Sequence, residues 1–188
     1  MFILFFNSSI RYLDIKLIKY KLEALTASKE YKALKENNPN KIRIKEVFSD
    51  SAKEYIYSLK NYCLENGIIY SNTPPYSQDL NGKSERINRT LLNKICCILY
   101  NARLPKYLWG EALEATVYIY NRSPYSYLNF KSPLEVKEKK QLSLDKLNNI
   151  KVFRSIVYYK NYTPNLKLNL KAYKGIIISY LLGNSYKI

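Results

Sequence analysis

Two acidic residues, Asp50 and Glu85, are of the right type and in the right local context to hold a divalent cation. They lie 35 residues apart in a chain with 31 Lys and Arg but only 15 Asp and Glu. Two neighbouring carboxylates repel one another, and a shared proton or a hard cation such as Mg²⁺ offsets that repulsion. In a basic chain, a Mg²⁺ ion held by two carboxylates can complete its coordination with phosphate oxygens. Because the same ion activates water or a hydroxyl for attack on a phosphodiester, these residues predict phosphoryl transfer. The ordinary alternative for Glu85 is an interaction with a helix dipole.

Four cations lie close to Glu85 in the sequence, and they predict a surface that contacts phosphates. They are Lys83, Arg86, Arg89 and Lys94. Contacts of this kind position a protein on nucleic acid without reading its sequence. The competing interpretation is a solvated helix surface.

The composition indicates a globular protein with a polyanionic partner. The chain is 47% hydrophobic and carries a formal charge of +16 over 188 residues, so it can bury a core and favours nucleic acid or an anionic surface. From Lys146 to the C-terminus there are eight basic residues and no acidic one. A coding bias toward Lys, Asn, Ile and Tyr is the alternative cause of this excess.

Histidine and cysteine usage excludes several classes of site. The absence of His removes His-based catalysis and Cys/His zinc fingers, so no zinc is expected. Cys63, Cys96 and Cys97 cannot all pair with one another, which predicts a reduced, intracellular chain. The apolar opening MFILFF is too short for a signal peptide or a membrane span, and no membrane partner is expected.

The elements that must position Asp50 and Glu85 follow from hydrophobic periodicity. Residues 2–6 and 11–18 predict a hairpin, 19–37 a helix, 41–49 a strand ending at Asp50, and 55–65 a helix stopped by Asn66-Gly67. Residues 68–71 predict a strand and 72–82 a long loop, after which Glu85 begins a helix. α/β folds assemble sites where strand ends and helix starts meet such loops.

The second half of the chain predicts two helices and a small β unit. Ile87, Leu91, Ile95, Ile98 and Ala102 form the apolar stripe of the first helix, with Glu85, Asn88 and Arg89 on an adjoining face. A second helix is expected to begin near Pro105 and to stop before Pro124. Residues 137–149 read as a polar link, and 151–159 and 174–180 as strands.

Several short sequence motifs, in the order and at the spacing of the family, resemble the integrase core of copia-type long-terminal-repeat retrotransposons. They are PYSQDLNG (75–82), ERINRTL (85–91), LPKYLW (104–109) and NRSP (121–124). The segments KSPLEV and KVFRSIVYY onward resemble the linker and the small Src-homology-like barrel that follow the core. The resemblance divides the chain into a partial core (1–136), a linker (137–150) and a small basic β unit (151–188).

The resemblance implies an α/β, RNase H-like fold and an Asp-Asp-Glu triad. Asp50 matches its second acid and Glu85 its third, both as catalytic residues and as ligands of Mg²⁺ or Mn²⁺. Asn88 and Arg89 match positions that face DNA ends, and Lys83, Arg86 and Lys94 add to that basic surface. The implied partners are retrotransposon ends and target DNA. A homo-oligomer and a nuclear location are compatible with the resemblance.

The match departs from the family at the first catalytic acid. MFILFFNSSIRY resembles the second strand of the fold, so the strand bearing the first Asp is expected to lie upstream of Met1. The family's acidic pair is replaced here by Asn7-Ser8, and Asp14, across the hairpin turn, is a poor substitute. Two-metal chemistry needs ligands for both cations. We therefore expect an integrase fragment that is inactive alone.

Two hypotheses from different classes remain at this point. One is a retrotransposon integrase fragment, related by descent to Mg²⁺-dependent strand transferases. The other is a non-catalytic DNA-binding or assembly protein that keeps only the basic surface. A translated pseudogene that never folds is a third reading, which a cooperative melt would exclude.

Overall fold

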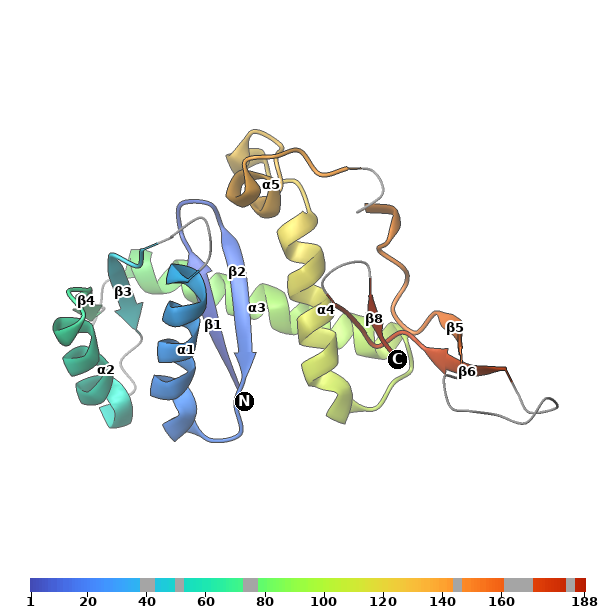
Figure 1. Ribbon diagram of the computed structural model, residues 1–188, viewed down its shortest axis with the longest axis horizontal. Helices are drawn as coiled ribbons and strands as arrows, with labels where there is room; N and C mark the ends of the chain where they lie inside the picture. The colour runs from blue at the N-terminus through green and yellow to red at the C-terminus, as the bar shows by residue number, and fades with distance from the viewer. Residues whose placement is uncertain (38–42, 50–52, 73–77, 144–146, 161–170, 182–184) are drawn as a thin grey trace. The chain divides into compact units, whose positions relative to one another are not determined.

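The computed structural model describes residues 1–37, 43–49, 53–72, 78–143, 147–160, 171–181 and 185–188 (Figure 1). By its internal contacts the chain divides into two compact units. One comprises residues 1–5 and 15–88, and the other residues 6–14 and 89–188. The predicted mixed α/β class is confirmed.

The predicted N-terminal hairpin is present as β1 (Phe2–Asn7) and β2 (Tyr12–Leu17). Its open end is closed by two hydrogen bonds, since the Met1 amino group donates to the Ile18 carbonyl and the Ile18 N–H donates to the Met1 carbonyl, each at 3.0 Å. On β2 Leu13 is fully buried and Ile15 is half-buried, whereas Leu17 at the end of the strand is 39% exposed. The sequence pattern therefore predicted both strands.

The predicted first helix is α1 (Ala24–Glu36), preceded by the 3-10 turn η1 (Lys21–Glu23). Ala24 and Ala27 are buried on it. Tyr31 stacks on Phe5 of β1, with ring centroids 3.9 Å apart, and Lys16 pairs with Glu30. These contacts pack α1 on the hairpin.

A parallel strand pair, β3 (Glu46–Ser49) and β4 (Ile69–Asn72), supports the predicted Asp50 position. Glu46 lies opposite Ile69 and Ser49 opposite Asn72. The strand begins later than predicted, because the Ile69 N–H bonds to the Lys45 carbonyl and pairing starts only there. Residues 41 and 42 of the predicted strand lie outside the described residues.

The helix α2 (Lys53–Glu65) crosses between these two strands and ends as predicted at Asn66-Gly67. Gly67 has φ +63°, the left-handed conformation that glycine adopts without strain. The Ile68 N–H bonds to the Cys63 carbonyl and the Gly67 N–H to the Leu64 carbonyl, which is a Schellman ending. Leu59, Cys63 and Ile68 form a buried apolar cluster between α2 and the strand pair, with Val47 and Tyr70 packed against it.

The long helix α3 (Gln78–Asn101) begins earlier than predicted. Residues 78–82 were expected in a loop because Asn81-Gly82 is a turn signal, but both residues lie within the helix, where Gly82 shows no left-handed φ. Residues 73–77 of that loop lie outside the described part. Of the predicted apolar stripe, Leu91, Ile95 and Ala102 are buried and Ile87 and Ile98 are half-buried, and Leu99, which was not predicted, is buried as well.

The next helix, α4 (Trp109–Arg122), follows a 3-10 turn, η2 (Lys106–Leu108). Pro105 was expected at the first helical position and instead precedes η2 in an extended conformation, with φ −68° and ψ 151°. Apolar and small side chains of α4 are buried along most of its length, among them Ala112, Leu113, Ala115 and Val117. With Leu91 and Ile95 of α3 they supply buried apolar side chains to the second unit.

A short helix that the sequence reading missed, α5 (Pro133–Glu138), follows the 3-10 turn η3 (Ser126–Leu128). Ser132 and Glu135 form a capping box, because the Ser132 hydroxyl accepts the Glu135 N–H and the Glu135 carboxylate accepts the Ser132 N–H. Pro133 occupies the first turn. The words Ser-Pro-Leu-Glu carry this signal in the sequence.

The C-terminal segment forms two antiparallel strand pairs. They are β5 (Ile156–Lys160) with β6 (Ala172–Ile176), and β7 (Ser179–Tyr180) with β8 (Tyr186–Lys187). The predicted strand began at Lys151, but Arg154 has φ +70° and β5 starts only at Ile156. Among the described residues these pairs do not join into one sheet, so the expected barrel stays a prediction.

The C-terminal strands pack on α4 within the second unit. The Tyr180 ring stacks on Tyr118 at 4.7 Å between centroids, and its hydroxyl donates to the Lys151 carbonyl. The Ser179 hydroxyl donates to Glu114 at 3.2 Å, and Lys187 pairs with Glu111 at 3.1 Å. The proposed boundaries at residues 136 and 150 stay an interpretation.

Candidate metal and nucleic-acid site

The strand pair β3–β4 places the position after Ser49 at the carboxyl edge of a parallel sheet. Ser49 lies opposite Asn72, so β3 and β4 end at the same edge of the sheet. Asp50 is the next residue along the chain, and it lies outside the described residues. Its expected place after a strand end is thus supported by the position of β3, while its side-chain contacts stay a prediction.

Glu85 lies in the second turn of α3 and is exposed. The buried residues Leu91 and Ile95 lie about 80–120° around the helix from Glu85, on an adjoining face, and the Glu85 side chain stays in solvent. Among the side chains the structure describes, Glu85 has no ion-pair partner. An exposed, uncommitted carboxylate can accept a cation or a hydrogen-bond donor.

Asn88 and Arg89 share the exposed face of α3 with Glu85. They follow it by three and four residues, the spacing that places side chains side by side on a helix, and both are exposed. A carboxylate, an amide and a guanidinium therefore lie within one turn. The amide and the guanidinium can donate hydrogen bonds to phosphate oxygens beside the carboxylate.

The other predicted cations lie elsewhere around the helix. Lys94 follows Glu85 by nine residues, or two and a half turns, which places it about 180° away. Its ammonium lies 5.8 Å from the centroid of the Tyr120 ring of α4. Arg86, one residue after Glu85, is exposed on a neighbouring flank, and Lys83 is helical with its side chain outside the described part. Of the predicted cations whose side chains the structure describes, Arg89 is therefore the one on the same helix face as Glu85.

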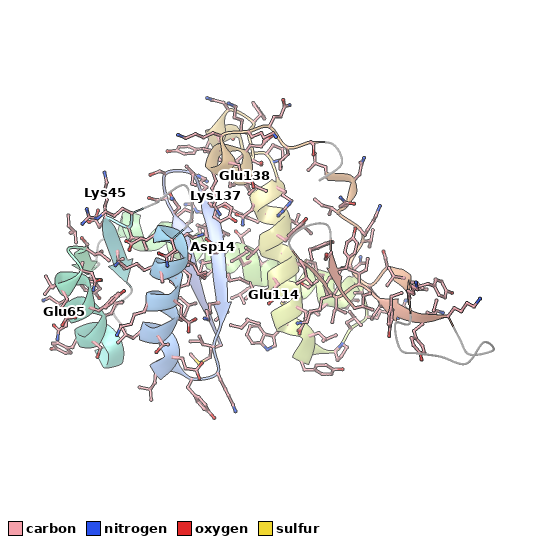
Figure 2. All side chains as sticks on the ribbon, in the orientation of Figure 1. Asp14, Lys45, Glu65, Glu114, Lys137 and Glu138 are labelled. Carbon is pink, nitrogen blue, oxygen red and sulfur yellow. The ribbon has the colours of Figure 1, made fainter. Side chains whose placement is uncertain are left out.

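The acidic residues of the described segments do not gather into a metal centre by themselves. In the described ranges no group of three or more His, Cys, Asp or Glu side chains could hold an ion. Asp14, which was considered and judged a poor substitute for the first acid, is half-buried on β2, where Figure 2 labels it. The candidate metal ligands are still Asp50 and Glu85, and carboxylate oxygens suit Mg²⁺ or Mn²⁺.

A second basic group, in the unit that contains α4, was not foreseen from the sequence. The Arg122 guanidinium lies 3.4 Å from the Tyr118 ring centroid, Lys137 lies 3.6 Å from that of Tyr12, and Arg11 lies 4.4 Å from that of Tyr127. Burial lowers the pKa of Arg122, with tyrosines and Glu138 opposing that effect. Figure 2 shows Lys137 and Glu138 at α5. Only the high tyrosine content hinted at this arrangement.

Sequence comparison places the chain beside transposon polyproteins. It is 33% identical over 182 residues to the retrovirus-related Pol polyprotein from transposon TNT 1-94 of Nicotiana tabacum, covering 95% of this chain. It is 30% identical over 134 residues, or 71% of the chain, to that of transposon RE2 of Arabidopsis thaliana, and 28% identical over 186 residues, or 98%, to that of RE1. The chain spans 13%, 9% and 12% of these relatives. No family model matches it.

Solved structures show the same fold at low sequence identity. The catalytic core domain of BIV integrase superposes with a TM-score of 0.54 and 16% identity, over 73% of this chain and 85% of that one. A chain of the simian T-cell lymphotropic virus intasome in complex with PP2A regulatory subunit B56 gamma gives 0.58 and 16%, over 94% and 61%. In the segments that the structure describes, no helix has the length and apolar character to cross a bilayer.

Proposed function

We propose that this chain, which belongs to the copia-type transposon Pol polyproteins and has the fold of an integrase catalytic core, binds DNA through α3. We also propose that it has no strand-transfer activity by itself. The observation that carries the proposal is the exposed triplet Glu85, Asn88 and Arg89 within one turn of α3. Asp50 would join Glu85 from the end of β3. The partners would be transposon ends and target DNA in the nucleus, with a homo-oligomer as the acting form.

Each side chain has a separate task in this site. Asp50 and Glu85 would hold Mg²⁺ or Mn²⁺, which supplies charge neutralisation at the scissile phosphate and a more acidic hydroxyl nucleophile. Arg89 would bind a phosphate oxygen and hold the strand, and Asn88 would donate a hydrogen bond beside it. Lys83, Arg86 and Lys94 would add charge attraction. A third carboxylate from outside these two would be needed for both cations.

The test measures binding and chemistry on the same labelled DNA. The chain is expected to bind a duplex with transposon-like ends in a salt-sensitive way and to give no nicking or strand transfer with Mg²⁺ or Mn²⁺. Mg²⁺ should raise the DNA affinity of the unmodified chain and not that of Glu85→Gln. Glu65→Gln, which changes another exposed acid, on α2, serves as the matched control.

The outcomes separate the two readings. Nicking that Glu85→Gln abolishes would show that the proposed inactivity is wrong while supporting the metal site. Binding that ignores Mg²⁺ and is equal or stronger in Glu85→Gln would favour the non-catalytic DNA-binding protein. That second function draws on the absence, in the described residues, of a three-acid cluster.

A further inference from the structure

The motif Asn121-Arg122-Ser123-Pro124 lies at the C-terminal end of α4, and its residues have no role in the proposed DNA site. Asn121 is only 4% exposed. Its side chain makes two hydrogen bonds with the backbone of Leu13, 108 residues earlier. The Leu13 N–H donates to Asn121 Oδ1 at 2.9 Å, and Asn121 Nδ2 donates to the Leu13 carbonyl at 2.7 Å. Both residues belong to the same unit.

Leu13 depends on these two bonds. It is fully buried on β2, so water cannot satisfy its backbone groups. The described part of this sheet contains only β1 and β2. Along a strand, successive residues direct their N–H and C=O to opposite sides, and those of Leu13 point to the Asn121 amide. The amide thus occupies the place that a third strand would take.

An asparagine is matched to this task by its functional groups. Its amide offers one acceptor and a donor in the same plane, as a peptide group of a neighbouring strand does. An aspartate carboxylate would accept the N–H but could not donate to the carbonyl, and a leucine of similar size could do neither. The match is therefore chemical as well as steric.

The surrounding contacts are less directional than this pair. Arg11 and Tyr12, the two residues before Leu13, take part in cation–π contacts with Tyr127 and Lys137, and such contacts tolerate displacement. A strand that slips by one residue turns every side chain to the other face. We propose that Asn121 is a positioning residue that stands in for a strand at the edge of β2 and fixes the register of the hairpin against α4.

The rest of the motif holds Asn121 in place. The Ser123 hydroxyl donates to the Ile119 carbonyl at 2.9 Å, and Arg122 Nη1 donates to the Tyr118 carbonyl at 3.2 Å. These bonds satisfy carbonyls in the last turn of α4, and Pro124 cannot continue the helix. The end of α4 is thereby fixed at the residue that reaches β2.

The first experiment is amide hydrogen exchange in the full chain. In Asn121→Leu the Leu13 N–H should exchange at least tenfold faster relative to the Leu113 N–H, a buried amide of α4 that reports general opening. Asn93→Leu, which changes an exposed asparagine of α3, should leave the ratio unchanged. Equal acceleration of both amides in Asn121→Leu would overturn the proposal, because only general stability would then have changed.

The second experiment uses pH to restore the missing donor. In Asn121→Asp the protonated acid can donate to the Leu13 carbonyl and accept its N–H, so burial and these bonds raise the pKa of the introduced carboxyl above its ordinary value of about 3.9. A raised pKa means that stability is present at low pH and is lost as pH rises through the folded-state pKa. The urea midpoint of Asn121→Asp should rise relative to Asn121→Leu between pH 7 and pH 4.

Comparing Asn121→Asp with Asn121→Leu cancels the effect of other titrating groups on the urea midpoint, because both variants contain those groups. Arg11, Asp14 and Arg122, the charged groups nearest the pair in sequence, and Tyr12 and Glu138, which interact with Arg122, are common to both. A urea midpoint difference between the variants that does not change with pH would overturn the proposal, because the protonated carboxyl would then gain nothing over leucine at the Leu13 backbone. A variant that fails to fold at pH 7 and folds at pH 4 would support it.

Discussion

Arg89 and Lys94 are both exposed cations on α3, yet only Arg89 shares a face with Glu85. The sequence pattern already placed Arg89 with Glu85 and Asn88 on one face of the helix, whereas Lys94 was included only as a nearby cation of the basic surface. Helix geometry gives them different neighbours, Glu85 for Arg89 and the Tyr120 ring for Lys94.

Arg89→Ala should therefore weaken DNA binding more than Lys94→Ala. Loss of one phosphate contact lowers the slope of log affinity against log salt by roughly 1. We expect that change for Arg89→Ala and a smaller one for Lys94→Ala, measured by fluorescence anisotropy from 50 to 200 mM salt. Equal slopes for the two variants would mean that the Glu85 face of α3 is not the face that meets DNA.

Glu135 gives the start of α5 a dependence on pH. Its carboxylate accepts the Ser132 N–H at 2.8 Å and the Leu142 N–H at 3.0 Å. These bonds to the ionised form, the Ser132 one first, lower the pKa of Glu135. A lowered pKa gives stability that is present above the unfolded value, about 4.3, and is lost as pH falls through the folded-state value.

Glu135→Gln should reduce that sensitivity to acid. Glutamine keeps an acceptor for the capping box but does not titrate. The unmodified protein should therefore be more stable than Glu135→Gln at pH 6, and the difference should shrink toward pH 3, as followed by urea unfolding at each pH. A difference that is constant with pH would show that the carboxylate bonds contribute nothing through ionisation.

Residue types, spacing and a family resemblance selected Asp50 and Glu85 as the candidate site. β3 ends at Ser49, directly before Asp50, and Glu85 is exposed on α3, while the approach of the two carboxylates to one another stays a prediction. The backbone role of Asn121 was not predictable, because nothing local links it to Leu13. Pairings across 108 residues depend on the tertiary fold.

At the scale of elements, periodic segments were predicted and irregular starts were not. The hairpin, α1, α2 and the body of α3 follow from regularly spaced apolar residues, of which Leu13, Ala27, Cys63 and Leu91 are buried in the respective elements. The start of α3 was missed because Asn81-Gly82 is a strong turn signal locally. The helix instead extends back to Gln78, with Gly82 inside it.

Gly82→Ala tests this early start. A Cβ at Gly82 would meet no atom within 4 Å, and the backbone there is helical. Alanine should then raise the free energy of unfolding by about 0.5–1 kcal/mol, because it loses less backbone entropy than glycine in a helix. Gly67→Ala is the matched control and should lower stability by about 1 kcal/mol, since φ there is +63°. Loss of stability in Gly82→Ala would indicate a turn at that residue.

At the scale of the molecule, the open question is whether the C-terminal strands form a separate domain. The sequence suggested a linker at 137–150 and an independent β unit. The structure groups residues 89–188 together, and within the described segments five side-chain contacts join β7 or β8 to α4 or to residues 149 and 151 before β5. A linker is read from local polarity, whereas docking depends on which side chains the fold buries.

Tyr180→Ala distinguishes a docked from an independent C-terminal unit. Tyr180 is 7% exposed and stacks on Tyr118, so its removal should cost about 3 kcal/mol in the unfolding of α4. Trp109 is the only tryptophan and lies at the start of α4, so its fluorescence reports that unfolding directly. The Trp109 transition should shift to lower urea.

Tyr158→Ala is the matched control for this shift. It removes the same side chain from β5, where Tyr158 is 73% exposed, and should move the Trp109 transition by less than about 0.5 kcal/mol. Because both tyrosines belong to the C-terminal strands, only docking on α4 predicts different effects at Trp109. If neither variant moves the transition, the strands fold apart from α4 and the boundary at residue 150 is correct.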